Sequence, residues 1–193
     1  MSIPLSASVD ARHGTELGVA VLTHQPLNNQ EIVASVADDG AGATAVFIGT
    51  TRNSFKGKVV TKLEYQAYSK LAIKTITDII AAAHANVSSA PLTAHTHTPL
   101  QASVFSGPRD EDSTTSTSAF RPQRLIRIAV HHRLGTVPVG EPSIVIAVSS
   151  PHRKESFVAC EMVLEEVKKK AQIWKREYYA GEKEDEAEWK ANA

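Results

Sequence analysis

The segment SIVIAVSSPHRKESFVACEMVLEEVKKKAQIWKREYY, residues 143–179, decides the fold. Its first part, residues 143–150, consists mainly of β-branched and small side chains, which predicts a buried strand. Apolar residues then recur at helical spacing, which predicts a long helix from about His152 to Ala171. Residues 173–179 predict a final strand. The sequence therefore places a long amphipathic helix between two strands.

Working outward, the remaining strands and helices follow from the same periodicities. Two further helices are predicted, a short one capped by Asn28 or Asn29 and ending near Ala37, and one from Tyr68 to about Val87. The polar turn at 51–57 and a second turn at 134–142 separate neighbouring strands. The four further predicted strands are residues 17–23, 43–50, 58–66 and 125–132.

The order of these elements indicates the fold class. Strands come mostly in adjacent pairs, and residues 43–50 and 58–66 look like the two arms of a hairpin. We therefore predict an α+β fold with three helices and a mostly antiparallel sheet, rather than a doubly wound sheet.

The domain organisation is predicted from composition. Residues 17–180 form one domain, preceded by a flexible N-terminus at 1–16 and followed by an acidic tail at 181–193 that frays. Residues 88–123 hold 17 Ser, Thr or Pro among 36 positions, which is typical of a low-complexity insertion. The fold should survive deletion of that insertion.

Composition also limits the class of function. The 193 residues are 42% hydrophobic, contain one cysteine and carry no net charge. No apolar run is long enough for a membrane helix, and no secretory signal is recognisable, so we expect a soluble, cytosolic protein. A neutral chain is not expected to bind nucleic acid in bulk. The positive charge is local, however: residues 152–176 hold seven Lys or Arg against four Glu.

The basic segment contains the candidate site residues. His152 and Arg153 stand at the start of the long helix, where free N–H groups suit a phosphate; an ordinary helix cap is the alternative. Lys168 flanks the apolar stripe near the other end, roughly 22 Å away, with its amine able to reach a cleft. Complementing the negative end of the helix is the alternative role for Lys168.

Two further groups of residues are candidates for the site. Lys175 and Glu177 share one face of the last strand, which allows acid–base work if they are partly buried and is otherwise a surface ion pair. Arg52 follows a strand of small residues and could meet an anion. We expect no metal or cofactor: His95 and His97 lie in the insertion without further ligands, and Cys160 falls on the apolar helix face.

Four segments together carry a family resemblance. GTTRNSFKGKVVTKLEYQAY (49–68), HHRLGTVPVGE (131–141), SSPHRKESFVAC (149–160) and KKKAQIWKRE (168–177) occur in this order. The sequence closely resembles the large-subunit family of molybdopterin synthase over nearly all of 17–180 except the insertion. The resemblance implies a hammerhead-like β substructure, a dimer of large subunits, and a heterotetramer with a small ubiquitin-like partner.

The resemblance also implies the reaction and the site. The small subunit carries a C-terminal thiocarboxylate, and its sulfur is transferred to cyclic pyranopterin monophosphate to form the dithiolene of molybdopterin. Lys168 and Lys175 are implied as catalytic, and Arg52, His152, Arg153, Arg176 and Glu177 as substrate-binding. A lysine at the rim of a core can have its pKa lowered enough to act as a base. His152 and Arg153 are hypothesised to reach the site from the other large subunit.

The chain departs from the family pattern at three positions and in the length of its insertion. The chain has Pro151, Gln172 and Gln66 where the family often has Ala, Pro and Glu, and the insertion is longer than expected.

Two other functions compete with catalysis. A non-catalytic scaffold would keep the fold, but a site that had lost its activity should also have lost at least one of its basic residues. All five are present: Arg52, His152, Arg153, Lys168 and Lys175. A nucleic-acid module using 152–176 would bind with a steep salt dependence.

Overall fold

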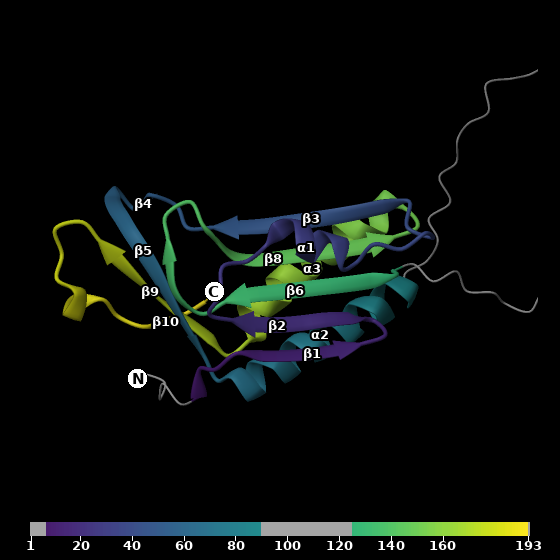
Figure 1. Ribbon diagram of the computed structural model, residues 1–193, viewed down its shortest axis with the longest axis horizontal. Coiled ribbons are helices and arrows are strands. Elements are labelled where there is room, and N and C mark those ends of the chain that lie inside the picture. Colours follow the sequence, from purple (N-terminus) through teal and green to yellow (C-terminus); the bar gives the residue numbers. More distant parts are fainter. Residues whose placement is uncertain (1–6, 90–124, 193) are drawn as a thin grey trace, which may run out of the picture.

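The computed structural model describes residues 7–89 and 125–192, which form two β-sheets and three α-helices (Figure 1). The first sheet has the order β1-β2-β6-β8-β3. Its strands are β1 (Ala11–Thr15), β2 (Gly18–Thr23), β6 (Arg127–Arg133), β8 (Pro142–Ser150) and β3 (Ala43–Thr50). The second sheet has the order β10-β9-β5-β4, with β7 also paired to β5. Its strands are β10 (Lys190–Ala191), β9 (Ile173–Tyr179), β5 (Lys58–Ala67), β4 (Ser54–Phe55) and β7 (Gly135–Pro138).

The helices cover both faces of the first sheet. Figure 1 shows α2 (Ser69–Ser89) and α3 (Arg153–Lys170) behind the sheet and α1 (Asn29–Ala34) in front of it. The main core lies between the sheet and the two long helices, where Ile76 and Ile80 of α2 and Val163 and Val167 of α3 are all buried. A smaller apolar cluster lies under α1. Burial on both faces explains why β8 reads as an unbroken apolar run.

Strand pairing corrects one prediction. Residues 43–50 and 58–66 do form strands, but they do not pair as a hairpin: β3 pairs with β8 in the first sheet, and β5 pairs with β9, β7 and β4 in the second. The turn between them instead holds the short strand β4, with Lys56 and Gly57 at positive φ. This connection carries the chain from one sheet to the other, as Figure 1 shows for β3, β4 and β5.

Regular structure extends into both ends of the chain that were predicted to be flexible. Residues 11–15 form β1, which pairs with β2. Residues 181–192 of the acidic tail include a short 3₁₀ turn at Glu184–Glu186 and then β10, which pairs with β9. The predicted turn at 134–142 contains β7. The predicted insertion lies outside the described residues from position 90 to 123.

Other predictions are confirmed. The fold is α+β and mostly antiparallel, with β2 and β6 as a parallel pair. Asn28 is the N-cap of α1, and its side chain accepts hydrogen bonds from the amides of Gln30 and Glu31. The long helices begin and end within two residues of their predicted bounds. In the described part of the chain, no helix is both long and apolar enough to cross a membrane.

Candidate active site

A cleft of about 380 Å³ lies where the two sheets and the C-terminal end of α3 meet. The first sheet contributes residues of β3, β6 and β8, and the second sheet contributes residues of β4, β5 and β9. Its polar or charged lining residues are Thr50, Arg52, Ser54, Tyr65, His132, Ser143, Lys168, Lys175, Glu177 and Asn192. The cleft therefore depends on how the two sheets pack, and no single segment of sequence builds it.

Four of the predicted site residues line this cleft together: Arg52, Lys168, Lys175 and Glu177. Lys168 follows the buried Val167 in the last turn of α3, and its exposed side chain lines the cleft. Lys170 instead forms an ion pair with Glu166 along the helix surface. Of these two lysines in the last turn of α3, Lys168 therefore lines the cleft and Lys170 does not.

The alternation of β9 sets the direction of its charged side chains. Lys175 and Glu177 face the cleft, and Lys175 Nζ lies 3.8 Å from Glu177 Oε1. Both side chains are mostly buried, with 25% and 10% of their surface exposed. Tyr65 of β5 lies directly across from Lys175 in the register. The two side chains thus share one face of β9, as predicted, and are largely withdrawn from solvent.

Arg176 faces the opposite side of β9 and does not line the cleft. Its Nε donates to Glu64 Oε2 at 2.9 Å, and its guanidinium stacks 4.7 Å from the ring centre of Trp189. Tyr178 donates its hydroxyl proton to the same Glu64 oxygen at 2.6 Å. Arg176 thus holds β9, β5 and the C-terminal segment together in this protomer.

His152 and Arg153 lie at the other end of α3 and are exposed. His152 is the N-cap residue, and its side chain makes no capping hydrogen bond. Pro151 directly precedes this cap residue. The 15 residues between Arg153 and Lys168 correspond to roughly 22 Å of helix, so one protomer does not bring both ends of α3 to one small ligand.

Two buried residues of the cleft are not among the predicted site residues. His132 is 1% exposed, and its Nδ1 lies 2.8 Å from the carbonyl oxygen of Arg133, which requires Nδ1 to carry the proton. Burial lowers the pKa of His132 to about 4, so the ring is neutral near pH 7. The ring packs edge-on against Tyr65 with centroids 4.9 Å apart, and burial raises the pKa of Tyr65.

The C-terminal segment also reaches the cleft. The backbone amide of Asn192 donates to Ile173, and its side-chain amide lies 3.2 Å from His132 Nε2. Because Nδ1 of His132 carries the proton, Nε2 accepts from Asn192. The acidic residues of 177–193 follow a basic segment, which could have indicated that the tail packs near that segment. No feature of the sequence identifies Asn192 as the residue that makes the contact.

The electrostatics of the cleft favour an anionic ligand. Its ionised lining side chains are three cations, Arg52, Lys168 and Lys175, and one carboxylate, Glu177. His132 adds no charge because its ring stays neutral. A concave site with a positive excess concentrates anions and steers their approach. In the two described stretches of chain, no group of three or more His, Cys, Asp or Glu side chains is arranged to hold a metal ion.

Two curated relatives are similar to this chain over most of its length and of their own. The chain is 39% identical over 171 residues to molybdopterin synthase catalytic subunit 2 of Aedes aegypti, covering 89% of this chain and 87% of the relative. It is 38% identical over 190 residues to the molybdopterin synthase catalytic subunit of Pyricularia oryzae, covering 98% of this chain and 81% of the relative.

Solved structures share the fold at lower identity. Molybdopterin synthase from Staphylococcus aureus superposes with a TM-score of 0.63 at 24% identity, covering 92% of this chain and 98% of that chain. A complex of subunits 1 and 2 of the molybdopterin-converting factor from Helicobacter pylori 26695 includes a chain with a TM-score of 0.53 at 17% identity, covering 85% and 91%. The sequence model of the MoaE protein family matches residues 22–102 and 111–170. The resemblance found in the sequence is thereby confirmed, and the chain belongs to the MoaE protein family.

Proposed function

We propose that this chain is the catalytic subunit of a molybdopterin synthase. It transfers sulfur from the thiocarboxylated C-terminus of a small ubiquitin-like subunit to cyclic pyranopterin monophosphate, forming the dithiolene of molybdopterin. The observation that carries the proposal is the convergence of Arg52, Lys168, Lys175 and Glu177 on one positively charged cleft. The names of the curated relatives support the same reaction.

Lys168 is the principal catalytic lysine in this proposal. The thiocarboxylate at the end of the small-subunit tail is an anion, and an ammonium group at the mouth of a restricted cleft would bind it. As sulfur bonds to the pterin, water adds to the acyl carbon and the bond from that carbon to sulfur breaks. The tail is left as a carboxylate, and negative charge develops on the acyl oxygen during the step. A fixed cation beside that oxygen stabilises the transition state more than the ground state.

Lys175 and Glu177 supply acid–base chemistry. Their 3.8 Å separation is longer than a direct hydrogen bond, so each group keeps hydrogen-bonding capacity for a substrate group or a water that bridges the two from the side. Both groups are largely withdrawn from solvent, which strengthens the effect of each charge on the other. We assign proton transfer at the pterin carbons that receive sulfur to this pair.

Arg52 binds the pterin, and His152 and Arg153 bind the phosphate in a site completed by a second large subunit. The distance between the two ends of α3 requires two chains if both ends serve one ligand. Exposed apolar side chains support self-association: Val46 and Ile48 on edge strand β3 are each 41% exposed, and Phe157 on α3 is 66% exposed. With two small subunits the assembly is a heterotetramer. Arg176 keeps its structural contacts and does not touch substrate from its own protomer.

The test is a reconstituted reaction. The chain is mixed with cyclic pyranopterin monophosphate and a small subunit in either the thiocarboxylate or the ordinary carboxylate form. We expect dithiolene product only with the thiocarboxylate, together with a loss in small-subunit mass that corresponds to replacement of sulfur by oxygen. A stable complex that never forms product would identify the chain as a non-catalytic scaffold and overturn the proposal.

A further inference from the structure

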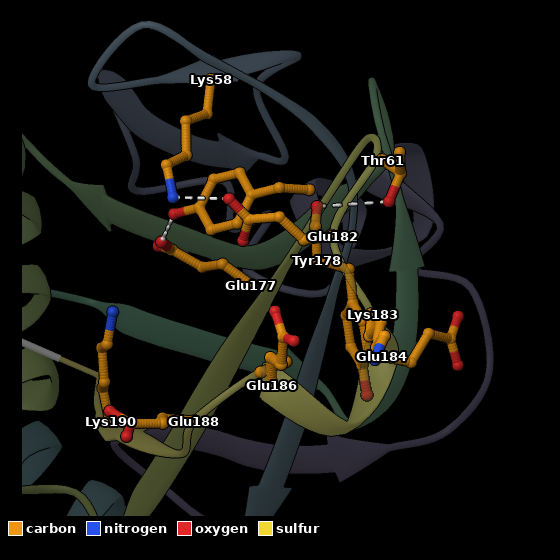
Figure 2. A pocket seen from close by; sticks show the side chains of 12 residues that line it. Lys58, Thr61, Glu177, Tyr178, Glu182, Lys183, Glu184, Glu186, Glu188 and Lys190 are labelled. Atoms are coloured by element: carbon orange, nitrogen blue, oxygen red, sulfur yellow. Dashed lines mark hydrogen bonds and ion pairs between the residues drawn. The ribbon is translucent and has the colours of Figure 1, made fainter.

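A second cavity, of about 260 Å³, lies on the other side of Glu177 from Lys175. Figure 2 shows this cavity, with Lys58 reaching Glu182 on one side and Glu177 beside them. Glu177 is the one described residue that lines both cavities, so its carboxylate forms part of the wall between them. What contacts Glu177 in the second cavity therefore bears on what it does in the first.

The second oxygen of Glu177 is held from this side. The hydroxyl of Tyr179, two residues along the same face of β9, donates to Glu177 Oε2 at 2.5 Å. Glu177 Oε1 is the oxygen that faces Lys175 Nζ. The carboxylate is thus fixed at one oxygen by a phenol and offers the other to the active-site lysine. Hydrogen bonds to a charged acceptor are short and directional, so this contact sets the carboxylate plane.

The Tyr179 ring is itself held in place. Lys58 Nζ lies 5.0 Å from the ring centre, and the same ammonium group pairs with Glu182 Oε1 at 2.5 Å. The amide of Ala180 donates to the carbonyl of Val59 at 2.9 Å, which fixes the backbone beside the ring. Burial, followed by the hydrogen bond to Glu177, raises the pKa of Tyr179 to about 12, so the phenol remains a donor throughout the neutral range.

We propose that Tyr179 is a positioning residue for the sulfur-transfer reaction, holding the Glu177 carboxylate so that it faces Lys175. This inference rests on the proposed function. Tyr179 touches neither the active-site cleft nor a substrate within it, so it acts only through Glu177. Without the phenol, the mostly buried Glu177 loses its one fixed partner and turns away from the geometry that serves Lys175.

The chain offers a matched control. Tyr178 makes the same kind of bond, from its hydroxyl to Glu64, but on the face of β9 that points away from the cleft. Tyr179→Phe and Tyr178→Phe each remove one phenol oxygen and one hydrogen bond to a carboxylate. A general loss of sheet stability would affect the two variants alike, whereas the positioning role belongs to Tyr179 alone.

The experiment measures product formation by the assembled enzyme for the wild type, both phenylalanine variants, Glu177→Gln, and the double variant Tyr179→Phe/Glu177→Gln. We expect kcat to fall about tenfold in Tyr179→Phe with KM for the pterin changed less than about twofold, and Tyr178→Phe to match the wild type. The double variant should be no slower than Glu177→Gln, because Tyr179 works through Glu177.

Equal rates for Tyr179→Phe and the wild type, or a full additional tenfold loss in the double variant, would overturn the inference. A crystal structure of Tyr179→Phe tests the geometry without relying on turnover. We expect the Glu177 carboxylate to be rotated away from Lys175; an unchanged carboxylate would refute the positioning role. Absence of product from the wild type itself would count against the proposed function, while the crystal structure would still decide the inference.

Discussion

Lys175 Nζ and Glu177 Oε1 face each other across 3.8 Å inside a cleft whose other charged lining residues are Arg52 and Lys168. They stand two residues apart on one strand, so their spacing is fixed by the pleat of β9. β9 belongs to the second sheet and pairs there with β5, whose Tyr65 lies opposite Lys175. A cation and a carboxylate in a shielded, preformed arrangement are suited to moving a proton at a substrate carbon.

Replacing Lys175 by Met should lower kcat by about a hundredfold, because general acid–base catalysis by one positioned group contributes on the order of 10²–10⁴. The methionine keeps the volume of the lysine stem, so the complex with the small subunit should form normally. Steady-state rates and gel filtration of the mixed subunits measure the two properties separately. A variant that retains more than half of the wild-type rate would remove Lys175 from the chemistry.

Stability should fall as the pH is lowered through the range where His132 titrates. The folded-state pKa is about 4 and the unfolded value is about 6.5, so the unfolded chain binds the proton first. The contribution of His132 to the free energy of unfolding is therefore complete above pH 6.5. Between pH 6.5 and 4 it falls by about 2 to 3 kcal/mol. His132→Asn should show a shallower decline in urea unfolding over this range, and equal slopes would contradict the assignment.

The ion pair of Glu141 with the buried Arg133 should raise the free energy of unfolding. Arg133 is 8% exposed and pairs with Glu141, while its Nε has no hydrogen-bond partner among the residues that the structure describes. Glu141→Ala leaves the buried guanidinium unpaired and should lower the free energy of unfolding by about 2 kcal/mol or more. Asp78→Ala, which breaks an exposed pair with Lys74, should change it by less than about 0.5 kcal/mol. Similar losses in both variants would argue against the burial effect.

Sequence patterns predicted the elements and part of the site because those features are local. Helical spacing in α3 identified the side of the helix on which Lys168 emerges, and strand alternation put Lys175 with Glu177. Pairing between strands far apart in the chain was not predictable from local pattern, so the expected hairpin of 43–50 with 58–66 was wrong. For the same reason the contact between His132 and Asn192 was not predicted, because the two residues are 60 positions apart in the chain.

The two ends of α3 lead to a prediction about assembly. Suppose that each site of a dimer takes Lys168 from one large subunit and His152 and Arg153 from the other. One subunit then carries His152→Ala and Arg153→Ala, and its partner carries Lys168→Ala, so that both substitutions fall in the same site. Mixed dimers should then contain one intact site and recover up to about half of the wild-type rate per dimer. Verified mixed dimers without recovery would show that each protomer builds its site alone.

Lys168 provides the most direct test of the central claim, because Lys169 is a neighbouring exposed control on the same turn of α3. Dithiolene formation from cyclic pyranopterin monophosphate and thiocarboxylated small subunit should be measured for the wild type, Lys168→Ala and Lys169→Ala. The account predicts a loss of about a hundredfold or more for Lys168→Ala, with complex formation retained, and a near-normal rate for Lys169→Ala. Equal rates for the two variants would contradict it.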